Sequence, residues 1–114
     1  MDDCVFCKIV RGEIPAAVLH DDESCLAFRD INPAAPQHVI IIPKEHIATL
    51  NDLSETTASI VGHIFRVAGK LATDLGISVS GYRIVANCNP EGGQEVFHVH
   101  FHLLGGRQMD WPPG

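Results

Sequence analysis

Hydrophobic and polar positions recur along the chain with two different periods, and the period distinguishes the helices from the strands. From residue 4 to 11 the apolar positions follow a helical spacing, and Gly12 is expected to end this short helix. Ser54 is the expected N-cap of a longer helix that continues to Gly76. The apolar positions of that helix recur at helical spacing at Ile60, Val61, Ile64, Phe65, Val67, Ala68 and Leu71.

The remaining apolar segments are short, β-branched and bounded by turn residues, which predicts strands. The acidic turn 21–23 joins two of them as a hairpin, Pro43 stops a third, and Gly105-Gly106 ends the last. Residues 32–36 form a rigid connection, residues 89–93 a turn-rich loop, and residues 111–114 a rigid tail. The five expected strands are 17–20, 24–29, 38–42, 82–87 and 96–104. Hairpin connections around one main helix predict an α+β fold with an antiparallel sheet.

Length and charge narrow the classes of protein that this chain can represent. Its 114 residues fit one domain, 1–114, and a hydrophobic content of 46% is enough for a core. The net charge of −6 argues against a surface that coats nucleic acid, which is normally basic. No nucleic acid partner is therefore expected, although a phosphate can still be bound locally.

The sequence also carries signals about the compartment. Its first residues lack the basic and apolar regions of a secretory signal, and no apolar run approaches the ~20 residues that span a bilayer. Without a secretory context, the four cysteines (Cys4, Cys7, Cys25 and Cys88) are better interpreted as thiols or metal ligands than as disulfides. A cytoplasmic protein with no membrane partner is expected.

The run from residue 98 to 102 is the main chemical signal of the sequence. Alternate residues of a strand point to one face, so His98, His100 and His102 are expected on the same side while the apolar residues between them pack. Histidine can act near neutral pH as a nucleophile, a proton donor or a metal ligand.

Two functional interpretations of this row compete, beside a third in which the histidines merely face solvent. The His-x-His spacing suits a zinc chelate, whereas a row of imidazoles also suits attack on phosphorus with neighbouring groups binding its oxygens. Immediately upstream, Gly92-Gly93-Gln94-Glu95 forms a loop in which backbone N–H groups can approach an anion. The loop favours phosphoryl chemistry.

At this point the sequence resembles a known family. The run His98-Val99-His100-Phe101-His102-Leu103-Leu104 matches the histidine triad (HIT) pattern, in which histidines alternate with apolar residues. Further segments look like the Hint branch, the histidine triad nucleotide-binding proteins. They are residues 22–28, 41–47, 92–94, 104–107 and Trp111-Pro112-Pro113-Gly114. The resemblance covers essentially the whole chain.

The resemblance implies both an assembly and an activity. It implies a homodimer whose subunits each give five strands to a continuous ten-stranded sheet. It also implies hydrolysis of the P–N bond of purine nucleoside phosphoramidates (AMP or GMP derivatives) and of related acyl-adenylates. His100 would be the nucleophile that carries a nucleotidyl intermediate, and His98, His102 and His38 would complete the catalytic set. Catalysis would require no cofactor.

The resemblance also assigns the nucleotide contacts. Asp30 would bind the ribose hydroxyls, the base would lie among Val5, Phe6, Ile9, Phe28 and Ile31, and the phosphate among Asn87, Gly93, Gln94 and Glu95. Glu95 departs from the family pattern, which commonly has Ser or Thr there. An ionised carboxylate repels a phosphate, so we expect the Glu95 side chain to turn away and only its backbone N–H to contribute. A contact with the leaving amine is the alternative.

A second site is suggested by Cys4 and Cys7, whose Cys-x-x-Cys spacing chelates zinc when two further ligands lie nearby. In relatives with this pair, the resemblance implies that a histidine of the Pro-Lys-x-His segment and the first triad histidine complete a structural zinc site. Here these are His46 and His98. Two inert thiols are the alternative. His20 and His63 are expected to be ordinary surface positions, and Cys25 and Cys88 are given no role.

Two rival functions remain open at the level of sequence. One is dinucleoside-polyphosphate hydrolysis, the activity of another branch of the superfamily, whose members are usually longer and lack the Trp-Pro-Pro-Gly ending. The other is a non-catalytic nucleotide sensor or scaffold, which would keep the pocket and tolerate loss of His100; the chain retains that histidine.

Overall fold

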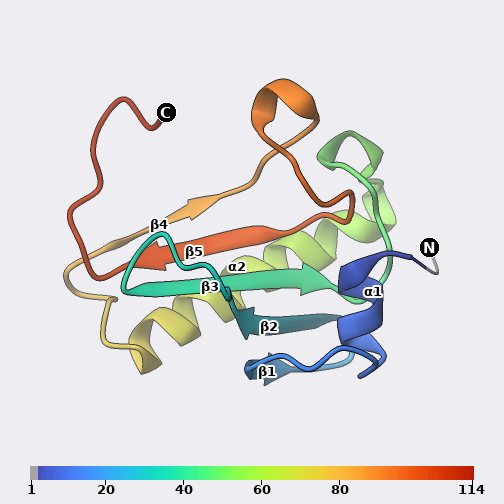
Figure 1. The fold of residues 1–114 in the computed structure, drawn as a ribbon, viewed down its shortest axis with the longest axis horizontal. Coiled ribbons are helices and arrows are strands. Elements are labelled where there is room, and N and C mark those ends of the chain that lie inside the picture. The colour runs from blue at the N-terminus through green and yellow to red at the C-terminus, as the bar shows by residue number, and fades with distance from the viewer. Residues whose placement is uncertain (1–2) are drawn as a thin grey trace.

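A five-stranded antiparallel sheet forms the centre of the molecule in a computed structural model that describes residues 3–114 (Figure 1). The strand order is β1-β2-β3-β5-β4, so the last two strands in sequence lie in reverse order beside β3. The strands are β1 Val18–Asp21, β2 Cys25–Arg29, β3 Gln37–Pro43, β4 Tyr82–Val85 and β5 Phe101–Gly105, and the helices are α1 Val5–Val10 and α2 Glu55–Asp74. Single 3-10 turns cover Leu50–Asp52 and Pro90–Gly92. The predicted α+β fold is confirmed.

The long helix α2 covers one face of the sheet, passing behind it in Figure 1. It begins as predicted, because the Ser54 and Thr57 side chains cap each other's backbone N–H groups. It ends at Asp74 with Leu75 as its C-cap, and Gly76 follows with a positive φ of 75°. The core between helix and sheet buries Val39 and Ile41 of β3 together with Ile64, Val67, Ala68 and Leu71 of the helix.

The opposite face of the sheet is covered at one end by α1. Phe6 of this helix packs on Phe28 with the two rings at 67° and 5.6 Å between centroids. Ile40 and Ile42 of β3 join the same cluster, so successive residues of β3 are buried on alternate faces of the sheet. β3 is therefore buried on both faces and contributes to both the core under α2 and the core under α1.

The last strand is shorter than the sequence predicts. The expected strand 96–104 pairs with β3 only from Phe101, which lies opposite Ile41. Before that point the Val99 N–H donates to the carbonyl of Ile47 at 2.7 Å, outside the sheet ladder. The reason is that β3 ends at Pro43, so residues 98–100 pack against the following loop instead. The alternation of side chains nevertheless persists, since Val99 is buried in the core beside α2.

A smaller difference concerns the edge strand β4. β4 ends at Val85 rather than at residue 87, which leaves Asn87 in the loop that follows.

Within residues 3–114, no helix combines the length and apolar character needed to cross a membrane.

Candidate functional site

A cavity of about 530 Å³ opens on the face of the sheet that α2 does not cover. Its walls come from α1, from the end of β2, from the loop 87–96 and from the histidine segment. His100 and His102 line it, whereas His98 and His38 do not. Two of the three histidines of the row therefore face the space where a ligand fits.

The orientation of the His100 ring is set by a hydrogen bond to the backbone carbonyl of His98. Its Nδ1 lies 2.7 Å from the carbonyl oxygen of His98. A carbonyl only accepts, so Nδ1 carries the proton and Nε2 of a neutral ring keeps its lone pair. The ring also contacts Phe6 edge to face, at 5.1 Å between centroids. His100 is buried, and its free nitrogen is the one that a substrate can meet.

His38 and His102 form a chain of hydrogen bonds with fixed direction. The backbone N–H of Ala34 donates to His38 Nδ1 at 2.9 Å, so the proton of a neutral His38 sits on Nε2. That Nε2 lies 2.9 Å from His102 Nδ1, which accepts, and 3.3 Å from Asp30 Oδ2. The proton of a neutral His102 is therefore on Nε2.

The electrostatics agree with this arrangement. Burial and the neighbouring rings of His100 and His38 lower the pKa of His102 to about 4. Burial likewise lowers the pKa of His38, with the Asp30 carboxylate opposing it. At neutral pH His102 is therefore neutral and presents one donor to the cavity.

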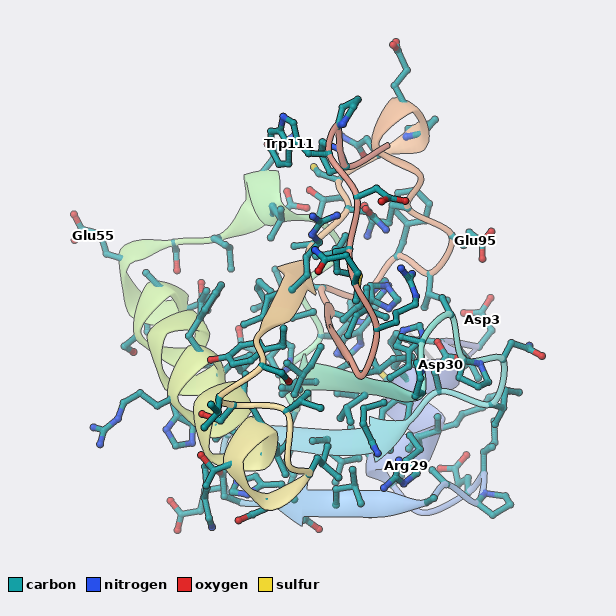
Figure 2. The ribbon with its side chains drawn as sticks, turned by 90° about the vertical axis from the view of Figure 1, so that its left-hand side faces the viewer. Asp3, Arg29, Asp30, Glu55, Glu95 and Trp111 are labelled. Carbon is teal, nitrogen blue, oxygen red and sulfur yellow. The ribbon has the colours of Figure 1, made fainter. Side chains whose placement is uncertain are left out.

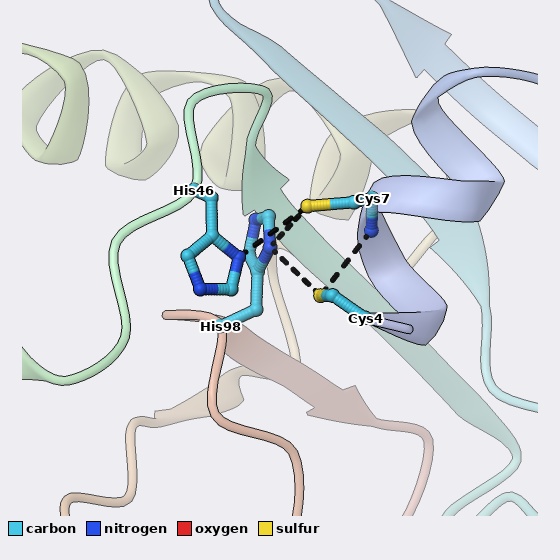
Figure 3. Close-up of side chains that lie close together, drawn as sticks. All are labelled: Cys4, Cys7, His46 and His98. Atoms are coloured by element: carbon cyan, nitrogen blue, oxygen red, sulfur yellow. Dashed lines mark hydrogen bonds between the residues drawn. The ribbon is translucent and has the colours of Figure 1, made fainter. Parts of the chain in front are cut away.

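The His98 ring does not line the cavity and points into a cluster of sulfur and nitrogen ligands (Figure 3). Its Nε2 lies 2.8 Å from the carbonyl oxygen of Pro43, which fixes the proton there. Its Nδ1 lies 3.4 Å from Cys4 Sγ and 3.6 Å from Cys7 Sγ, and His46 Nδ1 lies 3.3 Å from Cys7 Sγ. His98 is expected in both the catalytic set and the metal group; in the structure its ring is directed to the cysteines and does not line the cavity.

This cluster fits a zinc ion by its chemistry. The four ligand atoms of Cys4, Cys7, His46 and His98 all lie within 4.8 Å of one another. Two thiolates and two imidazoles are a common donor set of tetrahedral structural zinc. The hydrogen bond from His98 Nε2 to Pro43 leaves Nδ1 as the lone-pair ligand, which is how metal-binding histidines are usually oriented.

The structure brings together most of the predicted nucleotide contacts. Phe28, Asp30 and Ile31 line the cavity at the end of β2 and just after it, and residues of α1 line it as well. The predicted residues that line it are Val5, Phe6, Ile9, Phe28, Asp30, Ile31, Asn87, Gly93 and Glu95. Ile14, Pro15, Ala16, Arg29, Ile40 and Val96 also line it; sequence reasoning missed them because nothing in their spacing links them to the histidine row.

Gln94 is placed differently from the prediction. Its side chain is buried, donates to the carbonyls of Ala48 and Val96 at 2.8 and 3.1 Å, and accepts from the Asn89 N–H at 2.9 Å. These contacts fix the loop and leave the side chain no free group for a phosphate. The neighbouring Gly93 adopts a positive φ of 81°, which favours glycine.

Glu95 lies at the rim of the cavity, and its side chain is exposed and projects outward (Figure 2). Asp30 lies on the same side of the molecule in this view. The orientation agrees with the expectation that the Glu95 carboxylate turns away from a bound phosphate.

The histidines expected to be ordinary surface positions have a common partner. His20 Nε2 and His63 Nε2 lie 2.7 and 2.6 Å from the same oxygen of Asp22, and Cys25 Sγ donates to it at 3.5 Å. His20, Asp22 and Cys25 belong to the β1–β2 hairpin, whereas His63 comes from α2, 41 residues after Asp22, so no local motif linked it to the others.

Comparison with known proteins places this fold and site in one class. The HIT domain family matches residues 11–109. A crystal structure of a HIT family hydrolase from Legionella pneumophila superposes with a TM-score of 0.96 at 57% identity, covering 98% of this chain and 100% of that one. The chain belongs to the HIT domain family.

Two curated relatives are similar over nearly their whole length. A purine nucleoside phosphoramidase of Escherichia coli K12 is 46% identical over 108 residues, which cover 95% of this chain and 91% of the relative. A 14 kDa zinc-binding protein of Zea mays is 49% identical over 112 residues, covering 96% of this chain and 87% of the relative.

Proposed function

We propose that the protein hydrolyses the P–N bond of purine nucleoside 5′-phosphoramidates, and of related acyl-adenylates, through a nucleotidyl intermediate on His100. The observation that carries the proposal is the hydrogen bond that His100 Nδ1 donates to the backbone carbonyl of His98, which leaves Nε2 as the nucleophile toward the cavity. The similarity to a phosphoramidase at 46% identity supports it.

The reaction proceeds in two displacements. In the first, His100 Nε2 forms a bond to the α-phosphorus as the P–N bond breaks, and the amine leaves with one proton taken from water at the open side of the cavity. In the second, water attacks phosphorus, the bond to His100 breaks, and one proton returns to solvent. The sum is one water consumed, with an amine and a nucleoside monophosphate released.

His102 stabilises the charge on the phosphoryl oxygens. Its Nδ1 accepts from His38, so its Nε2–H is a donor at the cavity wall. A donor held in place before the reaction costs no reorganisation when charge develops. His38 acts through His102 as a positioning residue, and Asp30 Oδ2 holds His38 from the other side.

The nucleoside lies in the part of the cavity built by α1 and the end of β2. The aromatic faces of Phe6 and Phe28 support stacking of the purine base, and the Asp30 carboxylate accepts from the ribose hydroxyls. The phosphate lies between Gly93 and the two cavity histidines. The backbone N–H of Glu95 contributes there and its carboxylate does not.

The whole chain, 1–114, works as one domain.

Cys4, Cys7, His46 and His98 hold a structural zinc ion. When bound, the ion crosslinks α1, the loop after β3 and the segment before β5. The similarity to a zinc-binding protein at 49% identity supports this assignment. The ring of His98 is directed to the cysteines, so a bound zinc ion would orient the segment that carries His100. The two displacements proposed above use only side chains and water and need no cofactor.

The protein works as a homodimer in which the two sheets join. β4 is an edge strand of the sheet, and exposed apolar side chains flank it: Tyr82 on the strand, Val79 before it and Phe65 on α2. Pairing of β4 with its copy in a second subunit would cover this edge and give a ten-stranded sheet.

Turnover of a fluorogenic adenosine phosphoramidate tests the proposal. We expect His100→Ala to lose at least about 10³-fold in kcat while it still binds AMP, because the nucleophile is removed and the pocket stays. Arg66→Ala, on the exposed side of α2, is the control and should turn over normally. Nucleotide binding without turnover by the wild type would favour a sensor. Faster cleavage of a dinucleoside polyphosphate than of the phosphoramidate would favour the other branch of the superfamily.

A further inference from the structure

A second group of metal-ligating side chains lies on the α2 side of the sheet, away from the catalytic cavity. It consists of His20 on β1, Asp22 in the turn that follows, Cys25 at the start of β2 and His63 on α2. One ligand atom from each residue lies within 4.8 Å of the others. It shares no residue with the group formed by Cys4, Cys7, His46 and His98.

The carboxylate of Asp22 is held so that one oxygen is left for the cluster. Oδ1 accepts from the backbone N–H groups of Ser24 and Cys25 at 2.8 and 2.9 Å, and from Ser24 Oγ at 3.2 Å. Oδ2 faces His20 Nε2 at 2.7 Å, His63 Nε2 at 2.6 Å and Cys25 Sγ at 3.5 Å. A ligand carboxylate anchored through its other oxygen is typical of built metal sites.

We propose that His20, Asp22, Cys25 and His63 bind a Zn²⁺ ion. Two imidazoles, one carboxylate oxygen and one thiolate are all ligands that zinc accepts, and four of them suit its tetrahedral geometry. Zinc bonds of about 2.0–2.3 Å separate tetrahedral ligands by roughly 3.3–3.7 Å, so the two short contacts to Asp22 must each open by less than ~1 Å. Binding uses the Cys25 thiolate, and the thiol proton leaves to solvent.

Burial and charge around the cluster favour a cation. Cys25 is fully buried at the inner end, whereas the His63 side chain is 44% exposed and opens the cluster to solvent. The turn adds one further carboxylate, that of Glu23, whereas the Asp21 carboxylate is already paired with Lys44. An ion here would join the β1–β2 hairpin to α2, a helix that otherwise packs chiefly on β3 and β5.

Zinc content per chain tests the inference. Full-length protein is stripped with a chelator, dialysed against Zn²⁺ and then against metal-free buffer, and its zinc is measured by elemental analysis. We expect His63→Ala to hold one equivalent less per chain than the wild type, because an exposed ligand is removed without disturbing the core. Arg66→Ala on the same helix is the matched control and should keep the wild-type content.

A second variant separates metal binding from a simple hydrogen bond. Arginine at position 63 can still donate to Asp22 but has no lone pair for a metal. His63→Arg should therefore also hold one equivalent less, and the zinc-induced rise in Tm should be smaller in both His63 variants than in Arg66→Ala. Equal zinc content in the wild type and the His63 variants would overturn the proposal. The difference is counted in the presence of the Cys4 and Cys7 site, so the result does not depend on whether that site is filled.

Discussion

The ring of His100 is hydrogen-bonded to the backbone of His98, while the ring of His98 is turned to the cysteine pair. The two histidines are only two residues apart, yet their side chains serve different sites. The link between those sites is a single carbonyl group, 2.7 Å from His100 Nδ1. A metal ion held by the cysteines would therefore fix the position of the backbone that orients His100.

Removal of zinc is expected to affect stability more than chemistry. At free zinc about 100-fold above its dissociation constant, binding stabilises the folded state by about 2.7 kcal/mol. Chelation should therefore lower Tm by roughly 10 °C for a domain of this size, while the rate per folded molecule changes by less than about twofold. Thermal unfolding and kcat, measured with and without a chelator, check this. A collapse of kcat at unchanged Tm would contradict a structural role.

Loss of the His38 ring is expected to lower kcat and leave KM nearly unchanged. His38 Nε2 donates to His102 Nδ1, which keeps the other proton of His102 at the cavity. His38→Leu removes the donor, and we expect kcat to fall about 10- to 100-fold, as for other groups that orient a catalytic residue. His38→Gln can still donate and should recover part of the rate. Equal rates for the two variants would rule out the positioning role.

Asp30 is expected to contribute to ribose binding. Its carboxylate lies at the cavity wall, and hydrogen bonds to a charged group contribute roughly 1.5–3 kcal/mol. Asp30→Ala should therefore raise KM about 10-fold or more. The effect should be much smaller with a 2′,3′-dideoxy substrate, which lacks the hydroxyls. An equal loss for both substrates would indicate that Asp30 acts through His38 alone.

Substitution of Glu95 by serine is expected to maintain or improve AMP binding. The carboxylate is exposed at the rim, where its charge opposes that of the phosphate, and a hydroxyl can donate instead. Calorimetry of Glu95→Ser against wild type, with Glu91→Ser as a control for net charge, measures the difference. A loss of binding in Glu95→Ser would show that the carboxylate contacts the ligand.

The free energy of unfolding is expected to decrease as the pH is lowered from about 6.5 to about 4. His102 has a pKa of about 4 in the folded protein and an ordinary value near 6.5 when unfolded. In this range the unfolded chain binds a proton that the folded chain does not, so acid favours unfolding by roughly 3 kcal/mol. The loss levels off below pH 4. Denaturant unfolding at several pH values should show a smaller dependence in His102→Asn than in wild type.

The sequence was sufficient to predict the architecture because its local signals agree. Ser54 and Gly76 bound the long helix where expected, and the continuous β-branched run of β3 suits a strand that buries Val39 and Ile40 on opposite faces of the sheet. The predicted start of the last strand at residue 96 was wrong because a tertiary contact decides where the strand begins. The Val99 N–H donates to the carbonyl of Ile47 instead of continuing the sheet ladder.

The candidate site was predicted in part, and the division follows how far apart its residues lie. The alternation from 98 to 102 located the cavity histidines, but the turn of the His98 ring depends on Pro43 and on the cysteines. Gln94 has its three hydrogen bonds with backbone groups that no motif identifies. The meeting of His63 with Asp22 joins residues 41 positions apart, and sequence spacing holds no information about it.

Strand β3 carries at each end a group that orients a histidine, one in the cavity and one in the cysteine–histidine cluster. His38 at one end orients His102, and the carbonyl of Pro43 at the other end orients His98. A shift of register by one residue would turn every side chain of the strand to the opposite face of the sheet. An insertion or deletion within residues 38–43 should therefore displace the metal ligands and the cavity histidines together, whichever residue is added or removed.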